Sequence, residues 1–168
     1  MHGIITFIAK DFIVLSVIGT ALIWWRLPTN QKKQFVIFAI VGAILSILLA
    51  KLGSHLHNDP RPFVVGHFTP YFAHGNDNGF PSDHTLFTSF LAFTVWHYSR
   101  RGGQILLLIA VLVGLSRVIA GVHHLQDIIG SMLFALLGTW LAWKLIKRYL
   151  PTSDNRPRQR RTPQPDAS

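Results

Sequence analysis

Five apolar stretches of near membrane-spanning length divide this chain of 168 residues and constrain its fold more than any other feature. They cover residues 7–25, 35–52, 83–98, 105–121 and 128–149. Each holds about 16 to 22 residues, so a helix of that length spans about 24 to 33 Å, close to the ~30 Å hydrocarbon core of a bilayer. An isolated strand would leave its backbone amides unpaired in lipid. The pattern therefore predicts an all-α, polytopic membrane helix bundle with about five transmembrane helices.

The distribution of basic residues predicts the orientation of this bundle. Arg26, Lys32 and Lys33 follow the first stretch, and Arg100 and Arg101 follow the third. Lys144, Lys147 and Arg148 lie at the end of the fifth. Five spans place these segments on one side of the membrane, and the positive-inside rule makes that side cytoplasmic. The net charge of +9 then reflects topology and not nucleic-acid binding, because the basic residues are scattered at helix ends.

The composition also divides the chain into two parts. Residues 1–150 are expected to form the transmembrane domain, and residues 151–168, with four prolines and four arginines, a disordered basic cytoplasmic tail. Residues 1–9 carry no basic segment of the kind that opens a signal peptide, and no small-residue cleavage site follows the first stretch. The first span is therefore expected to be retained.

The two outward loops and the helix ends beside them hold three polar motifs. These are Pro60-Arg61-Pro62, Pro81-Ser82-Asp83-His84, and Ser116-Arg117 followed by His123 and Asp127. A guanidinium such as that of Arg117 costs about 2.5 to 3.5 kcal/mol within a membrane helix, so it calls for an anion. His123 and Asp127 are four residues apart, and on a helical turn the carboxylate can accept a ring proton and leave the other nitrogen free as a nucleophile. Taken alone, the pair could equally be an interface histidine and a capping aspartate.

The first two motifs supply groups for holding and protonating a phosphate. Ser82 is a suitable N-cap, so the amides of the following helix would point outward toward a phosphoryl oxygen. His84, in the first turn, could protonate a departing oxygen and later take a proton from water. Arg61 offers a planar fork that matches two phosphate oxygens. The alternative for the second motif is a plain helix cap.

The spacing of the third motif resembles the third signature of the type 2 phosphatidic acid phosphatase superfamily. The second motif looks like that superfamily's second signature, with Asp83 in place of the usual glycine, and Arg61-Pro62 looks like the end of its first. Within the superfamily, the stretches 7–11, 60–64 and 80–84 look most like bacterial undecaprenyl-diphosphate phosphatases of the bacitracin-resistance type. One departure is that Ser54 stands where the superfamily has a lysine. Lys51, one turn earlier, either replaces that lysine or snorkels at the interface.

The resemblance implies a role for each motif residue. His123 would be the nucleophile that forms a phosphohistidine, Asp127 its orienting group, and His84 the acid and base. Six residues would bind substrate, namely Arg61, Arg117, Ser82, Asp83, Lys51 and Ser116. The resemblance implies neither a metal nor another cofactor.

The resemblance also implies an activity, a place and a set of partners. We expect hydrolysis of undecaprenyl diphosphate to undecaprenyl phosphate and phosphate at the outer face of a bacterial inner membrane, which recycles the lipid carrier for envelope synthesis. The expected partners are this isoprenoid lipid diphosphate and membrane lipids, and no nucleic acid. The loop 56–79 could cover the headgroup with its aromatic residues, Phe63, Phe68, Tyr71 and Phe72.

Two alternatives stay open at this point. The nearer one keeps the chemistry and changes the substrate to phosphatidylglycerol phosphate, phosphatidate or an acceptor lipid in a phosphotransferase reaction. The farther one is a non-enzymatic metal carrier built from loop histidines, namely His55, His57, His67 and His74.

Overall fold

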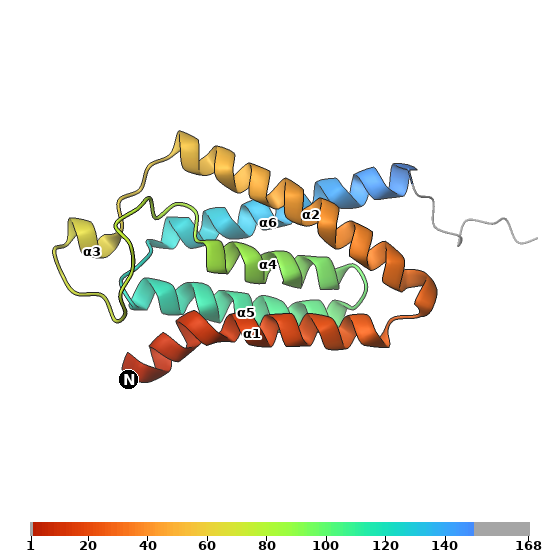
Figure 1. Ribbon diagram of the computed structural model, residues 1–168, viewed down its shortest axis with the longest axis horizontal. Helices are drawn as coiled ribbons and strands as arrows, with labels where there is room; N and C mark the ends of the chain where they lie inside the picture. Colours follow the sequence, from red (N-terminus) through yellow and green to blue (C-terminus); the bar gives the residue numbers. More distant parts are fainter. Residues whose placement is uncertain (1, 150–168) are drawn as a thin grey trace, which may run out of the picture.

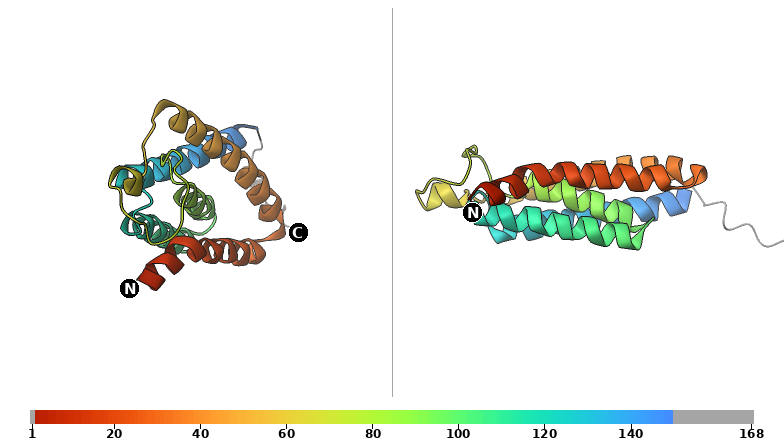
Figure 2. Two further views of the ribbon diagram at one scale, coloured as in Figure 1. Left: turned by 60° about the vertical axis from the view of Figure 1, so that its left-hand side comes forward. Right: turned by 90° about the horizontal axis from the view of Figure 1, so that it is seen from below.

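A computed structural model of the protein describes residues 2–149, and this part of the chain is helical with connecting loops. Its helices are α1 (His2–Arg26), α2 (Thr29–Leu56), α3 (Pro62–Val65), α4 (Asp83–Trp96), α5 (Arg100–Ile119) and α6 (Leu125–Tyr149). The four long helices α1, α2, α5 and α6 surround α4, and each of them packs against it (Figures 1 and 2). This confirms the predicted all-helical bundle. The predicted tail, 151–168, lies outside the described residues.

Within residues 2–149, the helices α1, α2, α5 and α6 are long and apolar enough to cross a membrane. The remaining predicted span forms α4, which has only 14 residues and is about 21 Å long at 1.5 Å per residue. Because α4 is enclosed by the other helices, protein and not lipid can cover its polar ends. The chain is therefore a multi-pass membrane protein, and the count of five crossings remains a prediction.

Most of the predicted helix starts are late. The second predicted span begins, as α2, at Thr29 and not at residue 35, and the fourth begins, as α5, at Arg100 and not at residue 105. The hydropathy of a segment marks only its apolar part, whereas a helix continues through polar first turns wherever its backbone hydrogen bonds are satisfied. Apolar stretches therefore predicted the order of the helices better than their bounds.

Small residues allow the helices to approach closely. A Cβ atom added to Gly138 of α6 would lie 2.6 Å from the backbone nitrogen of Ser46 in α2, and one added to Gly103 of α5 would lie 2.6 Å from Cα of Trp96 in α4. Such contacts between backbones are the usual means of helix association in lipid, where burial of apolar side chains gives little advantage. The first contact brings α6 close to α2, and the second brings α5 close to α4.

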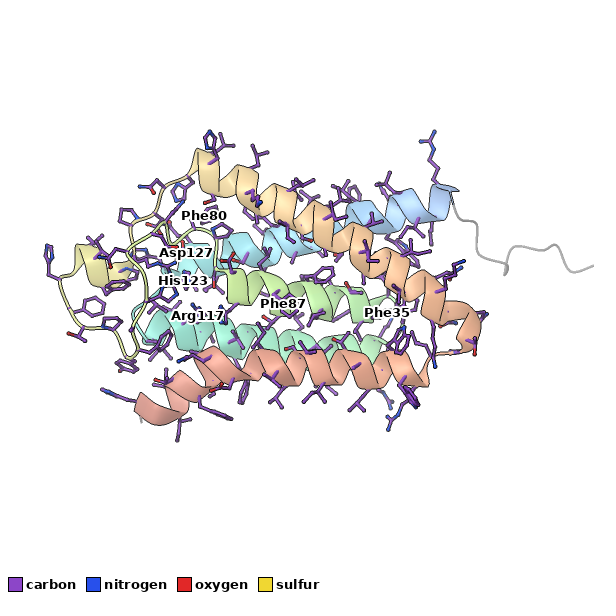
Figure 3. All side chains as sticks on the ribbon, in the orientation of Figure 1. Phe35, Phe80, Phe87, Arg117, His123 and Asp127 are labelled. Carbon is purple, nitrogen blue, oxygen red and sulfur yellow. The ribbon has the colours of Figure 1, made fainter. Side chains whose placement is uncertain are left out.

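The two ends of the bundle differ in character. Arg117, His123 and Asp127 lie together at one end, beneath the long connection between α2 and α4 (Figure 3). The opposite end carries the α1–α2 turn, the α4–α5 turn and the end of α6 (Figure 1). There, Lys32 Nζ lies 5.2 Å from the ring centroid of Trp24, and Lys144 Nζ lies 3.9 Å from that of Trp140. Basic and aromatic residues thus mark the end opposite the polar motifs, as interfacial anchors do.

Candidate active site

The turn after α5 places His123 beside the last turn of that helix. Gly121 has a φ of +78°, in the left-handed region that favours glycine. The backbone N–H of Gly121 donates to the carbonyl of Val118 at 2.9 Å, and that of Val122 donates to the carbonyl of Arg117 at 3.2 Å. These two bonds form a Schellman motif, which reverses the chain tightly. His123 is consequently carried back toward Arg117.

The start of α6 holds Asp127 and, through it, the ring of His123. Asp127 is the third residue of α6, and its Oδ2 accepts a hydrogen bond from the backbone N–H of His124 at 2.8 Å. This is half of a capping box, so the carboxylate is fixed by the helix terminus. The same Oδ2 lies 3.2 Å from Nδ1 of His123, and both side chains are almost completely buried. Asp127 therefore caps α6 and orients His123 at once.

The second ring nitrogen of His123 faces Arg61. Arg61 Nη1 lies 3.3 Å from His123 Nε2 and also donates to the carbonyl of Val122 at 3.0 Å. A guanidinium only donates, so Nε2 must accept and the ring proton belongs on Nδ1, facing Asp127. Burial lowers the pKa of His123, and the charges of Arg117 and Arg61 lower it further. The hydrogen bond to Asp127 raises this pKa but does not offset these effects, so the net pKa is below the usual value. The ring is then neutral at neutral pH, and its Nε2 lone pair is engaged by Arg61.

Arg61 is held from its other side by a residue that the sequence did not single out. Asp77 Oδ1 accepts from Arg61 Nε at 3.1 Å and lies 3.0 Å from Arg61 Nη2. The side chain of Arg61 is 5% exposed, whereas that of Asp77 is 72% exposed. Burial would raise the pKa of Asp77, but the charge and the hydrogen bond of Arg61 hold it below its usual value. An exposed carboxylate thus occupies the fork that a phosphate would use.

Arg117 is a buried cation that has no carboxylate within ion-pair distance in residues 2–149. It is 2% exposed, its Nη1 donates to the carbonyl of Ala9 at 3.1 Å, and its Nη2 lies 3.0 Å from Nε2 of His74. Its Nε is buried and has no hydrogen-bond partner in the described part of the chain. Removing a guanidinium from water without a counter-charge costs several kcal/mol. The arrangement favours an anionic ligand.

The second motif lies at the start of α4. Ser82 precedes this helix, but its side chain makes no capping hydrogen bond: Oγ accepts from Thr85 Oγ1 at 3.2 Å. The predicted hydroxyl cap is therefore not formed, because the buried hydroxyl is already engaged. The carbonyl of Ser82 accepts from Ser131 Oγ at 2.9 Å, which ties α4 to α6. His84 is partly buried and lies close enough to Arg117 and His123 to interact with them electrostatically.

The other predicted substrate-binding residues do not converge on this site. Lys51 is exposed on α2, and its side chain makes no hydrogen bond or ion pair with residues 2–149. Ser54, at the position of the superfamily lysine, accepts from Asn78 Nδ2 at 3.1 Å and anchors the loop. Ser116 Oγ donates to the carbonyl of Val113 within its own helix at 2.7 Å. Asp83 is exposed at the start of α4. Their roles in substrate binding remain predictions.

Asp59 and His124 complete a network that the sequence did not reveal. His124 Nδ1 lies 2.8 Å from Asp59 Oδ2, and ligand atoms of Asp59, His124 and Asp127 lie within 4.8 Å of one another. Such a group could hold a cation, but its atoms already bond to one another and to His123, so a supporting hydrogen-bond network accounts for the contacts. In the sequence, the only sign of this network is that Asp59 precedes Pro60 and His124 follows His123. The histidines of the metal-carrier alternative form no such group in the described residues.

An apolar cleft runs beside α4. A cavity of about 370 Å³ between α1, α2 and α4 is lined by residues that include Val17, Ala39 and Phe87. A neighbouring cavity of about 240 Å³ between α2 and α4 shares Phe87 and reaches Asp83 at the start of α4. The cleft therefore extends from Asp83 at the start of α4, past Phe87, to Phe35, which Figure 3 places toward the end of the bundle opposite the site.

A helical membrane bundle that buries two arginines around a histidine–aspartate pair has the architecture of an integral-membrane enzyme acting on phosphate groups. The sequence profile of the PAP2 superfamily matches residues 34–150. This chain belongs to the PAP2 superfamily.

Individual relatives agree with this assignment. The chain is 34% identical over 141 residues to the putative undecaprenyl-diphosphatase YbjG of Escherichia coli K12, covering 82% of this chain and 70% of the relative. It is 27% identical over 154 residues to the undecaprenyl-diphosphatase BcrC of Bacillus subtilis 168, covering 92% and 79%. These relatives confirm the predicted resemblance to the bacitracin-resistance type and the prediction of a hydrolase acting on lipid phosphates.

The fold also matches a solved structure. The crystal structure of Aquifex aeolicus LpxE superposes with a TM-score of 0.61 at 21% identity, covering 84% of this chain and 93% of the other. At this identity the likeness establishes the shared helical fold alone.

Proposed function

We propose that this protein hydrolyses undecaprenyl diphosphate to undecaprenyl phosphate and phosphate through a phosphohistidine at His123. The observation that carries the proposal is the unprotonated Nε2 of His123, which lies 3.3 Å from Arg61 Nη1 while Nδ1 is held by Asp127. A nucleophile, its orienting carboxylate and an anion-binding cation therefore meet at one buried point. The relatives named as undecaprenyl-diphosphatases support the choice of lipid.

The reaction is proposed to proceed in two steps. In the first, Nε2 of His123 attacks the terminal phosphorus, the bond to the bridging oxygen breaks, and His84 gives a proton to the departing lipid phosphate. In the second, His84 takes a proton from water, whose oxygen attacks the phosphorus and releases His123. Arg61 and Arg117 would stabilise the charge on the non-bridging oxygens in both steps. This requires Asp77 to leave the fork of Arg61.

The orientation in the membrane follows from the two ends of the bundle. Basic residues at the end opposite the site favour a cytoplasmic location for that end and for the C-terminus. The site would then face the periplasm or the cell exterior from a bacterial inner membrane. With α4 counted as a fifth crossing, the N-terminus lies on the outer side, which agrees with the placement of the site at that end.

The apolar cleft beside α4 is proposed to receive the isoprenoid chain. Its two cavities are lined mostly by apolar side chains, and Asp83 at the start of α4 lines the smaller one. A diphosphate held by Arg61 and Arg117 could thus keep its tail within the hydrocarbon region. Because the tail is in an apolar medium both in the bilayer and in the cleft, the cleft would act by positioning the tail and not by hydrophobic burial.

Turnover of purified lipid phosphates tests this proposal. Undecaprenyl diphosphate, phosphatidylglycerol phosphate and phosphatidate should be compared in detergent, with and without an acceptor lipid. We expect the highest kcat/KM for undecaprenyl diphosphate, and losses of at least ~100-fold in His123→Ala and His84→Ala. A higher kcat/KM for a glycerophospholipid, or phosphate transfer to the acceptor in preference to water, would contradict the proposed substrate or reaction.

A further inference from the structure

His74 enters the site from the loop between α3 and α4, and the two-step reaction above does not use it. Its Nε2 lies 3.0 Å from Arg117 Nη2. Its ring centroid lies 6.0 Å from that of His123, with the two planes at 80°. The side chain is partly buried. His74 thus stands between the buried cation and the proposed nucleophile.

The hydrogen bond to Arg117 defines the protonation state of His74 in the empty site. A guanidinium offers only donors, so Nε2 of His74 must accept and the ring is neutral. Burial lowers the pKa of His74, and the positive charges of Arg61 and Arg117 lower it further. A neutral imidazole therefore occupies the position at Arg117 that an anion would fill.

We propose that His74 is a substrate-binding residue that exchanges Arg117 for a phosphate oxygen when the lipid diphosphate binds. The inference rests on the proposed function, since it assigns a further contact within the same site. A charged phosphate oxygen forms a stronger hydrogen bond with a guanidinium than a neutral imidazole does, so it displaces Nε2 from Arg117. The displaced ring then lies beside the bound phosphate.

The ring can serve the phosphate as a donor. A nearby negative charge favours the protonated imidazole, and Nε2 can take up a proton from solvent and donate it in a hydrogen bond to a non-bridging oxygen. The charged and titratable groups that act on the ring are Arg61, Arg117, His123, His84 and Asp77. Bound phosphate offsets the two arginines, which are the groups that keep the ring neutral in its absence.

The loop around His74 is fixed independently of that side chain, which makes the residue testable. The backbone N–H of Tyr71 donates to the carbonyl of Ala120 at 3.1 Å, and Asn78 Nδ2 donates to the carbonyl of Ser54 at 3.0 Å. His67, in the same loop, is exposed and has a φ of 51°. His67→Asn is a matched control, because asparagine tolerates that backbone conformation.

Steady-state kinetics with undecaprenyl diphosphate give the first test. His74→Ala should raise KM about 10- to 100-fold, the range for losing a hydrogen bond to a charged group, and change kcat less than about 3-fold. His74→Gln, whose amide can accept and donate, should recover most of the loss, and His67→Asn should match the wild type. A fall in kcat at unchanged KM, or failure of His74→Gln to recover KM, would overturn the inference.

Binding of inorganic phosphate separates this inference from the proposed function. Calorimetry should compare His123→Ala with His123→Ala/His74→Ala, because neither variant needs to turn over a lipid. Weaker phosphate binding in the double variant supports the role of His74 even if undecaprenyl diphosphate proves not to be the substrate. Equal affinity in the two variants would overturn it, whatever the activity of the wild type.

Discussion

Asp127 serves His123 and the start of α6 with a single oxygen. Its Oδ2 lies 3.2 Å from Nδ1 of His123 and accepts from the backbone N–H of His124 at 2.8 Å. The group that orients the proposed nucleophile is therefore fixed by the helix that it caps. Because the helix start fixes the Asp127 side chain, the contact with His123 holds the imidazole ring in one orientation.

Replacing Asp127 with asparagine tests this double role. The amide can still cap α6, so the loss of stability should stay near 1 kcal/mol or below. It cannot stabilise the cationic ring that forms on attack, and kcat should fall by about 10³- to 10⁴-fold, as in comparable histidine–aspartate pairs. Thermal unfolding and single-turnover kinetics measure the two effects. A kcat within about 10-fold of wild type would contradict the orienting role.

The acid limb of the pH profile should report His123. Protonated His123 cannot attack, and its pKa lies below the usual value, so kcat/KM should hold down to about pH 6.5 and fall as the pH drops further through that lowered pKa. Asp127 raises the pKa of His123, so Asp127→Asn should move the limb to lower pH. Titration of the substrate is common to both enzymes, so the difference between their profiles isolates the histidine. An acid limb at the same pH in the wild type and in Asp127→Asn would contradict the assignment of this limb to His123.

Removing the charge of Asp77 should strengthen phosphate binding. The carboxylate occupies the fork of Arg61 but is 72% exposed, and such exposed pairs contribute about 0.2 to 1 kcal/mol. Asp77→Asn should therefore lower KM by about 1.5- to 5-fold with little change in kcat. A KM that rises would show that Asp77 supports Arg61 and does not compete with the substrate.

Gly79 lies where any side chain would press on the network. An added Cβ would be 3.0 Å from the carbonyl oxygen of Asp59 and 3.2 Å from Oδ2 of Asp127. Gly79→Ala should reduce kcat at least about 10-fold and lower stability by about 1 to 3 kcal/mol, as overpacking does. In Gly75→Ala, the control from the same loop, the added Cβ meets only the side chain of Asp77. Equal activity of the two variants would contradict the tight packing around Asp127.

Filling the apolar cleft should affect long-chain substrates selectively. Ala39 lines the larger cavity of the cleft, and Ala39→Phe should raise KM for undecaprenyl diphosphate about 10-fold (~1.4 kcal/mol), because the added ring overpacks the space for the tail. A soluble short-chain isoprenyl diphosphate should be hydrolysed as by the wild type. Leu133→Phe, on the exposed face of α6, is the control. Equal effects on both chain lengths would place the tail elsewhere.

The sequence predicted the helices and the grouping of the motifs because both depend on local patterns. Apolar runs specify membrane helices, and the spacing from His123 to Asp127 is that of one helical turn. The contacts of the loop could not be predicted in this way. Asp77 reaches Arg61 and His74 reaches Arg117 across 16 and 43 residues, and only the packing of the loop on α1 and α5 brings them together.

Ser82 shows a second limit of local reasoning. Its position before α4 was predicted, but the hydroxyl bonds to Thr85 Oγ1 and not to a backbone N–H. Whether a serine caps a helix depends on which competing partners tertiary packing places beside it. Likewise, α4 is shorter than a membrane span because the surrounding helices, and not lipid, cover it.

Detection of phosphate on His123 tests the central claim most directly. Undecaprenyl diphosphate labelled in its terminal phosphate should be mixed with enzyme, quenched in alkali to preserve phosphohistidine, and the protein mapped by mass spectrometry. We predict label on His123 in the wild type and none in His123→Ala. Label on a different residue, or normal phosphate release by His123→Ala, would contradict the account.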